Sequence, residues 1–201
     1  MPCAIFARKW AILLAALFLI CVRPATGAAH PHVFADNAVT FVFDGGELTG
    51  IRLVWHFDEM FGATLLEDYD ANHDGAFDAA ERRTLKSEAF DNLRNYGYFT
   101  YLTVGGTRKP VSQVADFGAG VDGDGMYYSF VVPCRVPAGT EVRLAVFDPE
   151  YYVDFYTPED SAVSVEGASA LSVRHAVAPN PNLTFSTWLV TPTEITLSFH
   201  K

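Results

Sequence analysis

Hydrophobic and polar residues alternate along most of the chain, in short stretches separated by turn residues. The first two stretches, 33–43 and 48–57, are rich in β-branched, aromatic and aliphatic residues and flank an Asp-Gly-Gly turn. Alternation with a period of two predicts strands with one buried face, and the turn predicts a hairpin. The pattern returns at 98–104, 127–132, 141–147, 151–156, 161–165, 171–177 and 193–200. Many short strands of this kind predict a mainly antiparallel β sandwich or open barrel.

The spacing of apolar residues becomes helical between the second and third predicted strands. Residues 59–69 form one helix candidate, and 79–96 form a second whose apolar residues recur on one face. Gly97 follows as a helix stop. The expected fold class is therefore α+β, with residues 58–97 inserted into the β body as an EF-hand-like helix-loop-helix.

The loop between the two predicted helices, residues 70–81, has the spacing of an EF-hand calcium loop. In such loops positions 1, 3, 5, 9 and 12 supply side-chain oxygens, position 7 supplies a carbonyl, and a glycine at position 6 permits the turn. The expected ligands are Asp70, Asn72, Asp74, the Ala76 carbonyl, Asp78 and Glu81. A hard ion that prefers oxygen is predicted, with calcium ahead of magnesium. The alternative is a solvated acidic turn that binds no ion.

The first 29 residues have the pattern of a secretory signal peptide. Arg8 and Lys9 precede an apolar run, 10–22, which small residues follow. The run is short for a membrane span, and no later segment is long and apolar enough to cross a bilayer. We therefore expect residues 1–29 to be removed and residues 30–201 to form a single domain in the periplasm, without direct insertion into the membrane.

The charge balance argues against nucleic acid as a partner. The chain has 14 Lys+Arg and 24 Asp+Glu, a formal net charge of −10, whereas phosphate binding needs clustered cations. No nucleophile elbow, zinc-protease motif or phosphate-binding glycine loop is present in the sequence, so we do not expect an enzyme. Cys134 lies in an apolar run and is expected to be a buried core residue rather than a reactive thiol.

Two further acidic segments are interpreted as turns. Residues 122–125 (Asp-Gly-Asp-Gly) resemble half a calcium loop, but no glutamate follows at the required distance, so a hairpin turn is expected. Residues 148–154 combine acids and tyrosines and are interpreted as a proline-led turn into an aromatic strand.

The histidines near the expected new N-terminus are candidate transition-metal ligands. If cleavage leaves His30 first, its α-amine and imidazole can chelate nickel, cobalt, zinc or copper, and His32 or a distant histidine can complete the site. Cleavage after Gly27 would instead leave Ala-Ala-His, a chelator of Cu(II) or Ni(II). His56 and His175 are the further candidates for an added ligand. The alternative is a polar terminus whose histidines bind no metal.

Five segments taken together resemble one protein family. They are 30–36 (HPHVFAD), 55–61 (WHFDEMF), 70–81, 92–100 (NLRNYGYFT) and 147–152 (FDPEYY). In this order, and over nearly all of the mature chain, they resemble the exported bacterial family called domain of unknown function 1007. Members are often described as the periplasmic component of an uncharacterised ABC-type transport system and tend to be encoded beside nickel/cobalt-type permeases. The resemblance implies a periplasmic role in transition-metal transport or homeostasis with an inner-membrane metal permease as partner, although His56 departs from the residue expected there.

Three functional hypotheses follow from these features. The first is a periplasmic accessory protein of nickel-, cobalt- or zinc-type transport or homeostasis, with structural calcium at 70–81. The second is an exported binding or assembly module that calcium stabilises and that has no transition-metal role. The third is a copper redox enzyme built on His30 as the terminal residue, which needs a second imidazole nearby.

Overall fold

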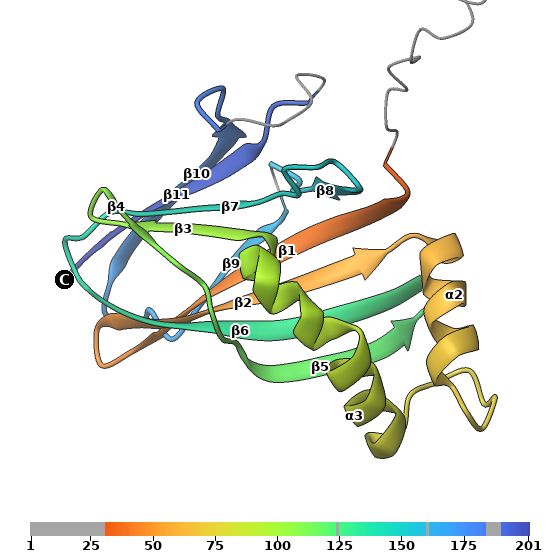
Figure 1. The fold of residues 1–201 in the computed structure, drawn as a ribbon. Helices are drawn as coiled ribbons and strands as arrows, with labels where there is room; N and C mark the ends of the chain where they lie inside the picture. The colour runs from red at the N-terminus through yellow and green to blue at the C-terminus, as the bar shows by residue number, and fades with distance from the viewer. Residues whose placement is uncertain (1–30, 124, 160, 184–189) are drawn as a thin grey trace, which may run out of the picture.

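Two β-sheets lie one over the other in the computed structural model, which describes residues 31–123, 125–159, 161–183 and 190–201 (Figure 1). The strands of the first sheet are β1 (Val33–Asp44), β2 (Glu47–Phe57), β5 (Ala115–Asp122), β6 (Gly125–Pro137), β8 (Val153–Tyr156) and β9 (Val163–Glu166). Those of the second sheet are β3 (Thr100–Val104), β4 (Thr107–Lys109), β7 (Val142–Val146), β10 (Ser172–Pro179) and β11 (Thr193–His200). The predicted signal peptide and His30 lie outside the described residues.

The strand orders are β5-β6-β2-β1-β8, with β9 also paired to β1, and β10-β11-β7-β3-β4. The prediction of a mostly β chain with antiparallel-rich sheets is confirmed. Neither sheet closes on itself into a barrel. The predicted first hairpin forms, with Asp44 opposite Glu47. Strand β1 also pairs in parallel with β8 and β9, which alternation did not predict because it assigns a face and not a neighbour.

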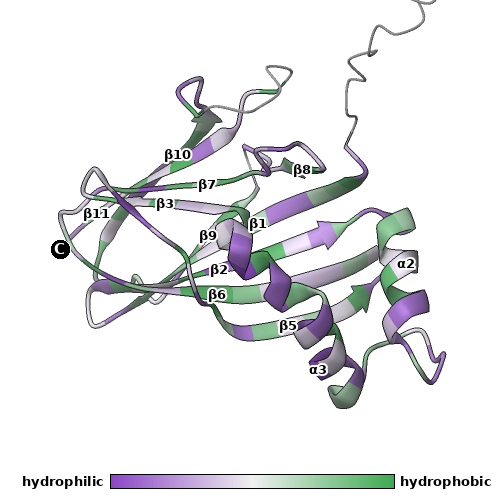
Figure 2. Ribbon diagram, viewed as in Figure 1, coloured by the Kyte–Doolittle hydropathy of each residue, from purple (hydrophilic) through white to green (hydrophobic). Residues whose placement is uncertain are grey.

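The core lies between the sheets because each long strand buries alternate residues. Along β1 every second residue from Val33 to Phe43 is buried, as the period-two pattern requires. Trp55 is 1% exposed, and its ring lies 4.8 Å from those of both Phe130 and Phe155. Burying a large apolar side chain stabilises the fold by about 1.5–3 kcal/mol. Figure 2 shows hydrophobic residues along these strands and a mixture of hydrophobic and hydrophilic residues on the helices.

Strand β5 was not predicted, and its sequence explains why. Gly118 and Gly120 interrupt the apolar alternation, and a glycine inside a strand supplies no side chain to pack. The ring of Tyr127 on β6 covers Gly120, since a Cβ there would meet the tyrosine oxygen at 2.8 Å. The hairpin expected at 122–125 is confirmed, because Asp122 pairs with Gly125.

The helices α2 (Glu59–Tyr69), α3 (Ala79–Glu88) and the 3₁₀ helix η1 (Phe90–Phe99) come between β2 and β3, and α2 and α3 lie at one end of the sandwich (Figure 1). The Asp58 carboxylate caps α2 by accepting the Phe61 N–H at 3.0 Å. It also accepts the Phe34 N–H at 2.8 Å, which fixes α2 to the start of β1. Within the described residues, no helix has the length and hydropathy needed to cross a bilayer.

The single helix expected over 79–96 is wrong, because α3 ends at Glu88 and η1 follows with a different geometry. At the end of η1, Gly97, Tyr98 and Phe99 have φ angles of 61°, 52° and 48°. Left-handed backbone costs a non-glycine residue about 1–3 kcal/mol and persists only where packing enforces it. Tyr98 and Phe99 are 1% and 8% exposed, so their burial stabilises this left-handed turn. As a result, β3 begins at Thr100 and not at residue 98, where the strand was predicted to begin.

Candidate metal centre

The loop between α2 and α3 is folded by its own acidic side chains. Asp70 accepts the backbone N–H of Asp74 at 3.2 Å on one oxygen and that of Gly75 at 2.8 Å on the other. Asn72 accepts the Asp74 N–H at 2.8 Å, and Asp74 accepts the Ala76 N–H at 3.0 Å. Gly75 has a φ of 79°, which glycine adopts without strain. The side chains predicted as ligands therefore turn back toward the loop backbone.

The end of the loop is fastened by a reciprocal cap at the start of α3. The Asp78 carboxylate accepts the N–H groups of Glu81 at 2.9 Å and Ala80 at 2.6 Å, and these bonds lower the pKa of Asp78. Glu81 is 7% exposed and accepts the Asp78 N–H at 2.8 Å and the Asn72 N–H at 3.2 Å. One buried carboxylate thus joins the beginning of the loop to its end.

The donor chemistry of this loop fits a hard cation. A carboxylate has about four lone-pair sites, and Asp70 and Glu81 each use two of them on backbone N–H groups. The loop contains no Lys or Arg, and none of its acids forms an ion pair within the described residues. Among all the described residues, no group of three or more His, Cys, Asp or Glu side chains lies close enough together to hold a metal ion. The residue types therefore fit calcium, while the carboxylates in this structure accept hydrogen bonds from N–H groups of the loop backbone.

His32 lies where the described chain begins, against the turn that precedes β8. Its backbone N–H donates to the Tyr152 carbonyl at 2.9 Å, and the two rings lie 5.0 Å apart between centroids. Both side chains are exposed. His32, near the start of the described chain, is thus held at a defined place on the β body.

Asp148 organises that turn, which the sequence indicated only as a proline-led turn. The residue is 4% exposed, and its carboxylate accepts three backbone N–H groups, from Glu150 at 2.9 Å, Tyr152 at 3.0 Å and Val153 at 3.1 Å. Because Tyr152 also holds His32, the Asp148 carboxylate supports the position of the N-terminal histidine. The Asp-Pro dipeptide is the sequence feature that could have indicated the turn and its aspartate, but it carries no sign of the contact with His32.

The other candidate histidines are placed on separate elements. His56 is exposed on β2, opposite Asp36 of β1. Asp36 lies four positions after His32, which corresponds to about 13 Å of extended chain. His175 lies on β10 in the second sheet, opposite Leu197. The structure therefore does not bring His32, His56 and His175 together, in line with the absence of a metal-binding group among the described residues.

Cys134 is half-buried on β6, and burial raises the pKa of its thiol to about 11. Because only the thiolate is a nucleophile, a rise from 9.0 to about 11 lowers the thiolate population about 100-fold at pH 8. We expect Cys134 to react with an aromatic disulfide reagent about 100-fold more slowly in the folded protein than in urea. A rate equal to that of the unfolded chain would contradict this.

The same shift predicts a pH dependence of stability. The unfolded thiol ionises near 9.0 and the folded one near 11, so the contribution of this group is complete below pH 9 and is lost as the pH rises through 11. The difference in unfolding free energy between the wild type and Cys134→Ala is therefore expected to shrink over this interval, which urea denaturation at several pH values measures.

Comparison with known proteins places the chain in a family. A family model described as protein of unknown function (DUF1007) matches residues 14–188. The chain belongs to the DUF1007 family. An uncharacterised protein of Haemophilus influenzae is 29% identical over 157 residues, which cover 76% of this chain and 74% of that protein. An uncharacterised 15.5 kDa protein in the trpE 3′ region of Spirochaeta aurantia is 29% identical over 131 residues, or 64% of this chain and 94% of that protein. The family membership expected from five sequence segments is thus confirmed.

Proposed function

We propose that this DUF1007 protein is an exported accessory of transition-metal transport or homeostasis, stabilised by calcium at residues 70–81. The observation that carries the proposal is the fixed position of His32 beside Tyr152. This contact holds His32 beside the start of β1, and His30 lies two positions earlier in the sequence. An exposed imidazole is a ligand for nickel, cobalt, zinc or copper.

The proposal includes the processing and location of the chain. Residues 1–29 act as a signal peptide and are removed, so that residues 30–201 form one mature domain in the periplasm. An inner-membrane metal permease is the proposed partner, because the DUF1007 resemblance implies it. The strongly acidic balance of the chain supports cations rather than nucleic acid as its ligands.

In the same proposal residues 58–97 act as an EF-hand-like insertion. Calcium would be held by Asp70, Asn72, Asp74, the Ala76 carbonyl, Asp78 and Glu81. It would supply a positive charge among four carboxylates that have no cation of their own in the loop. Phe77 is 4% exposed and anchors the loop in the core, so a loop made rigid by the ion would fix α2 relative to α3.

The N-terminal site is tested by titrating exported, processed protein with Ni(II), Co(II), Zn(II) and Cu(II). We expect the double substitution His30→Ala, His32→Ala to weaken binding of at least one of these metals about tenfold or more, because imidazoles are lost from the site. Intact mass of the same samples identifies the bond cleaved by the signal peptidase. Isothermal titration calorimetry measures the affinities.

The matched control is His56→Ala, His175→Ala, which removes the same number of imidazoles from places remote from His32. Its affinity is expected to equal that of the wild type. Unchanged affinity in the N-terminal double variant, or a loss confined to the control, would refute the proposed site.

A second candidate is a calcium-stabilised binding or assembly module without a transition-metal role. It is favoured by the separation of His32, His56 and His175 over different strands and sheets. The same separation leaves a copper redox enzyme without a second imidazole beside His32 among the described histidines. Absence of any transition-metal binding by the processed protein, together with a stabilising effect of calcium, would select this module.

A further inference from the structure

A groove of about 430 Å³ is lined by residues of η1, β3 and β4 and by the segment that follows β4. In Figure 1 this segment passes η1 on its way from the second sheet to the first. The two are close there, because a Cβ placed on Gly97 would lie 3.6 Å from the Val111 carbonyl oxygen. Sites for small molecules have volumes of about 300–1,000 Å³, so this groove has room for one.

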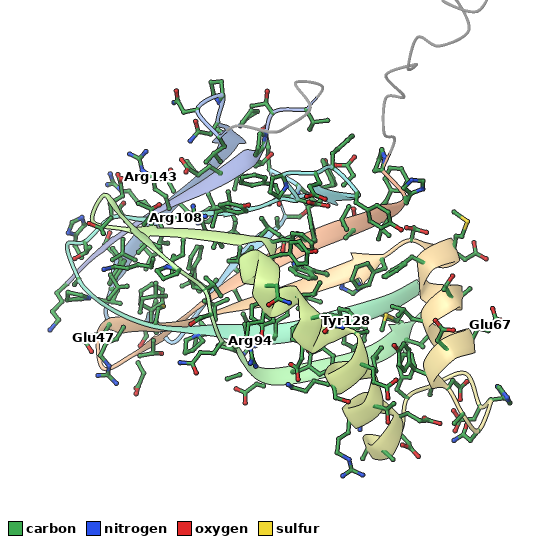
Figure 3. The ribbon with its side chains drawn as sticks, viewed as in Figure 1. Glu47, Glu67, Arg94, Arg108, Tyr128 and Arg143 are labelled. Atoms are coloured by element: carbon green, nitrogen blue, oxygen red, sulfur yellow. The ribbon has the colours of Figure 1, made fainter. Side chains whose placement is uncertain are left out.

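Three cationic residues line this groove, and none of its lining residues is acidic. Arg94 comes from η1, and Arg108 and Lys109 come from β4; Figure 3 labels the two arginines. All three residues are exposed, and none of them forms an ion pair within the described residues. The chain as a whole has 14 Lys+Arg and 24 Asp+Glu. The fold therefore gathers positive charge at one place on a strongly acidic molecule.

The acids whose charges act on the two arginines are already bonded to other groups. Asp91 acts on Arg94, but its carboxylate pairs with Lys86 at 2.6 Å. Glu194 acts on Arg108, but its carboxylate accepts an asparagine N–H at 2.9 Å and lies 3.9 Å from a different arginine. These acids therefore reduce the positive potential of the groove without occupying it.

Aromatic stacking holds the Arg108 guanidinium in place. Its central carbon lies 4.2 Å from the centroid of the Tyr101 ring. Phe147 stacks on the same ring, with 3.9 Å between centroids and an interplanar angle of 13°. Two groups this close to the ring centre cannot share one face, so Tyr101 lies between them. Stacking uses the face of the planar guanidinium and not the N–H groups along its edge, and these match two oxygens of a carboxylate or phosphate.

The charge of the rest of the molecule limits the size of the ligand. The Debye length is about 8 Å at physiological salt, so a small anion in the groove interacts mainly with the cations that line it. An anionic membrane or a long polyanion would extend over the acidic remainder of the surface, which would repel it. We propose that the groove binds a small polyvalent oxyanion, a molecule with two or more carboxylate or phosphate groups. Arg108 binds one of these groups in a bidentate pair, and Arg94 and Lys109 bind the others.

This site is independent of the proposed metal chemistry. None of the calcium-loop residues and none of the candidate histidines lines the groove. Anion binding is therefore measured in metal-free buffer, where neither proposed metal site contributes. Its outcome and the outcome of the metal titrations can be told apart.

The test titrates the processed protein with tricarballylate and with pyrophosphate by isothermal titration calorimetry. We expect saturable binding of at least one probe with a Kd of about 1 mM or below. Raising the salt from 0.1 to 1 M shortens the Debye length from about 10 to about 3 Å, so binding should weaken at least about fivefold. The triamide of tricarballylate has the same shape without the charges and is expected not to bind. Absence of saturable binding by both anions, or equal binding of the triamide, would overturn the proposal.

Substitution of the arginines tests the location. Arg108→Gln is expected to weaken binding about tenfold or more, because charge-assisted hydrogen bonds are lost. Arg143→Gln is the matched control, since Arg108 and Arg143 lie on opposite sides of Thr103 in the same sheet. Arg143 is already paired with Glu141 at 2.7 Å, so its removal changes the net charge equally and should alter the affinity by less than about twofold. Equal losses in the two variants would refute the assignment to the groove.

Two further variants and a membrane assay complete the test. Arg108→Lys keeps the charge without the planar fork and should bind with intermediate affinity; wild-type affinity would overturn the bidentate pair. Arg94→Gln gives a second measure of location if Arg108→Gln does not fold. Vesicles of equal parts phosphatidylglycerol and phosphatidylcholine are expected not to sediment the protein. Sedimentation that Arg108→Gln abolishes, without binding of either soluble anion, would assign the groove to a lipid surface and refute the proposed ligand.

Discussion

Calcium at about 10 mM is expected to raise the melting temperature of the wild-type protein, and Glu81→Gln is expected to abolish the rise. A site with the affinity of extracellular modules, about 10⁻⁴ to 10⁻³ M, gains about 1.4–2.7 kcal/mol from this concentration by mass action. For a domain of this size, that corresponds to about 3–11 °C. Glu81 is chosen because it is expected to bind with both oxygens and because it already joins the two ends of the loop.

The measurement is thermal unfolding followed by circular dichroism, with and without a chelator. Glu81→Gln is expected to lower the melting temperature even without calcium, since one acceptor of a loop N–H is lost, so the calcium-dependent difference is the quantity to compare. Glu88→Gln is the matched control, because Glu88 is an exposed residue at the far end of the same helix. If the chelator leaves the wild-type melting curve unchanged, calcium has no structural role in this protein.

Asp148→Ala is expected to cost about 3 kcal/mol or more of unfolding free energy, because hydrogen bonds to a charged group contribute about 1.5–3 kcal/mol each. Three backbone N–H groups lose their acceptor in this variant. The turn that contacts His32 therefore loses the side chain that holds its backbone in place. Asp148→Asn keeps one oxygen and should lie between the wild type and Asp148→Ala. Urea denaturation gives all three values.

Asp154→Ala is the matched control for Asp148→Ala. Asp154 lies a few residues further along the same segment and is only half-buried, and its carboxylate accepts the Tyr151 hydroxyl at 3.2 Å. Its removal is expected to cost about 1 kcal/mol or less. If the two alanine variants lose the same stability, the Asp148 carboxylate is not the centre of this turn. The prediction also bears on function, since loosening the turn should weaken any metal site that includes His32.

The local sequence pattern predicted the strands in which apolar and polar residues alternate. Alternation placed β1 and β2, because each strand buries one face against the same core. The pattern failed where packing overrides local preference. The helix expected over 79–96 changes after Glu88, because burial of Tyr98 and Phe99 enforces a left-handed turn. Strand β5 is held by pairing with β6 although its glycines give no alternating signal.

The candidate sites also differ in how much of each the local sequence predicts. The spacing of residues 70–81 fixes the donor types of a calcium loop, since all of these oxygens lie within twelve consecutive residues. The sequence also indicated His30 and His32, but it gave no sign that Asp148 and Tyr152 support the second of them. That support joins residues more than a hundred positions apart, which a local pattern does not encode.

The sequence by itself determined the alternating strands, the acidic loop, the excess of acidic residues and the membership of the DUF1007 family. The tertiary structure alone decided the parallel pairing of β1 with β8 and β9, the separation of the histidines and the support of His32 by Asp148 and Tyr152. The physical reason is that these features arise from contacts between distant segments, as in the hydrogen bond that spans 120 positions from Asn37 to Thr157. Their geometry depends on how the two sheets and the helices pack, and local periodicity carries no information on that packing.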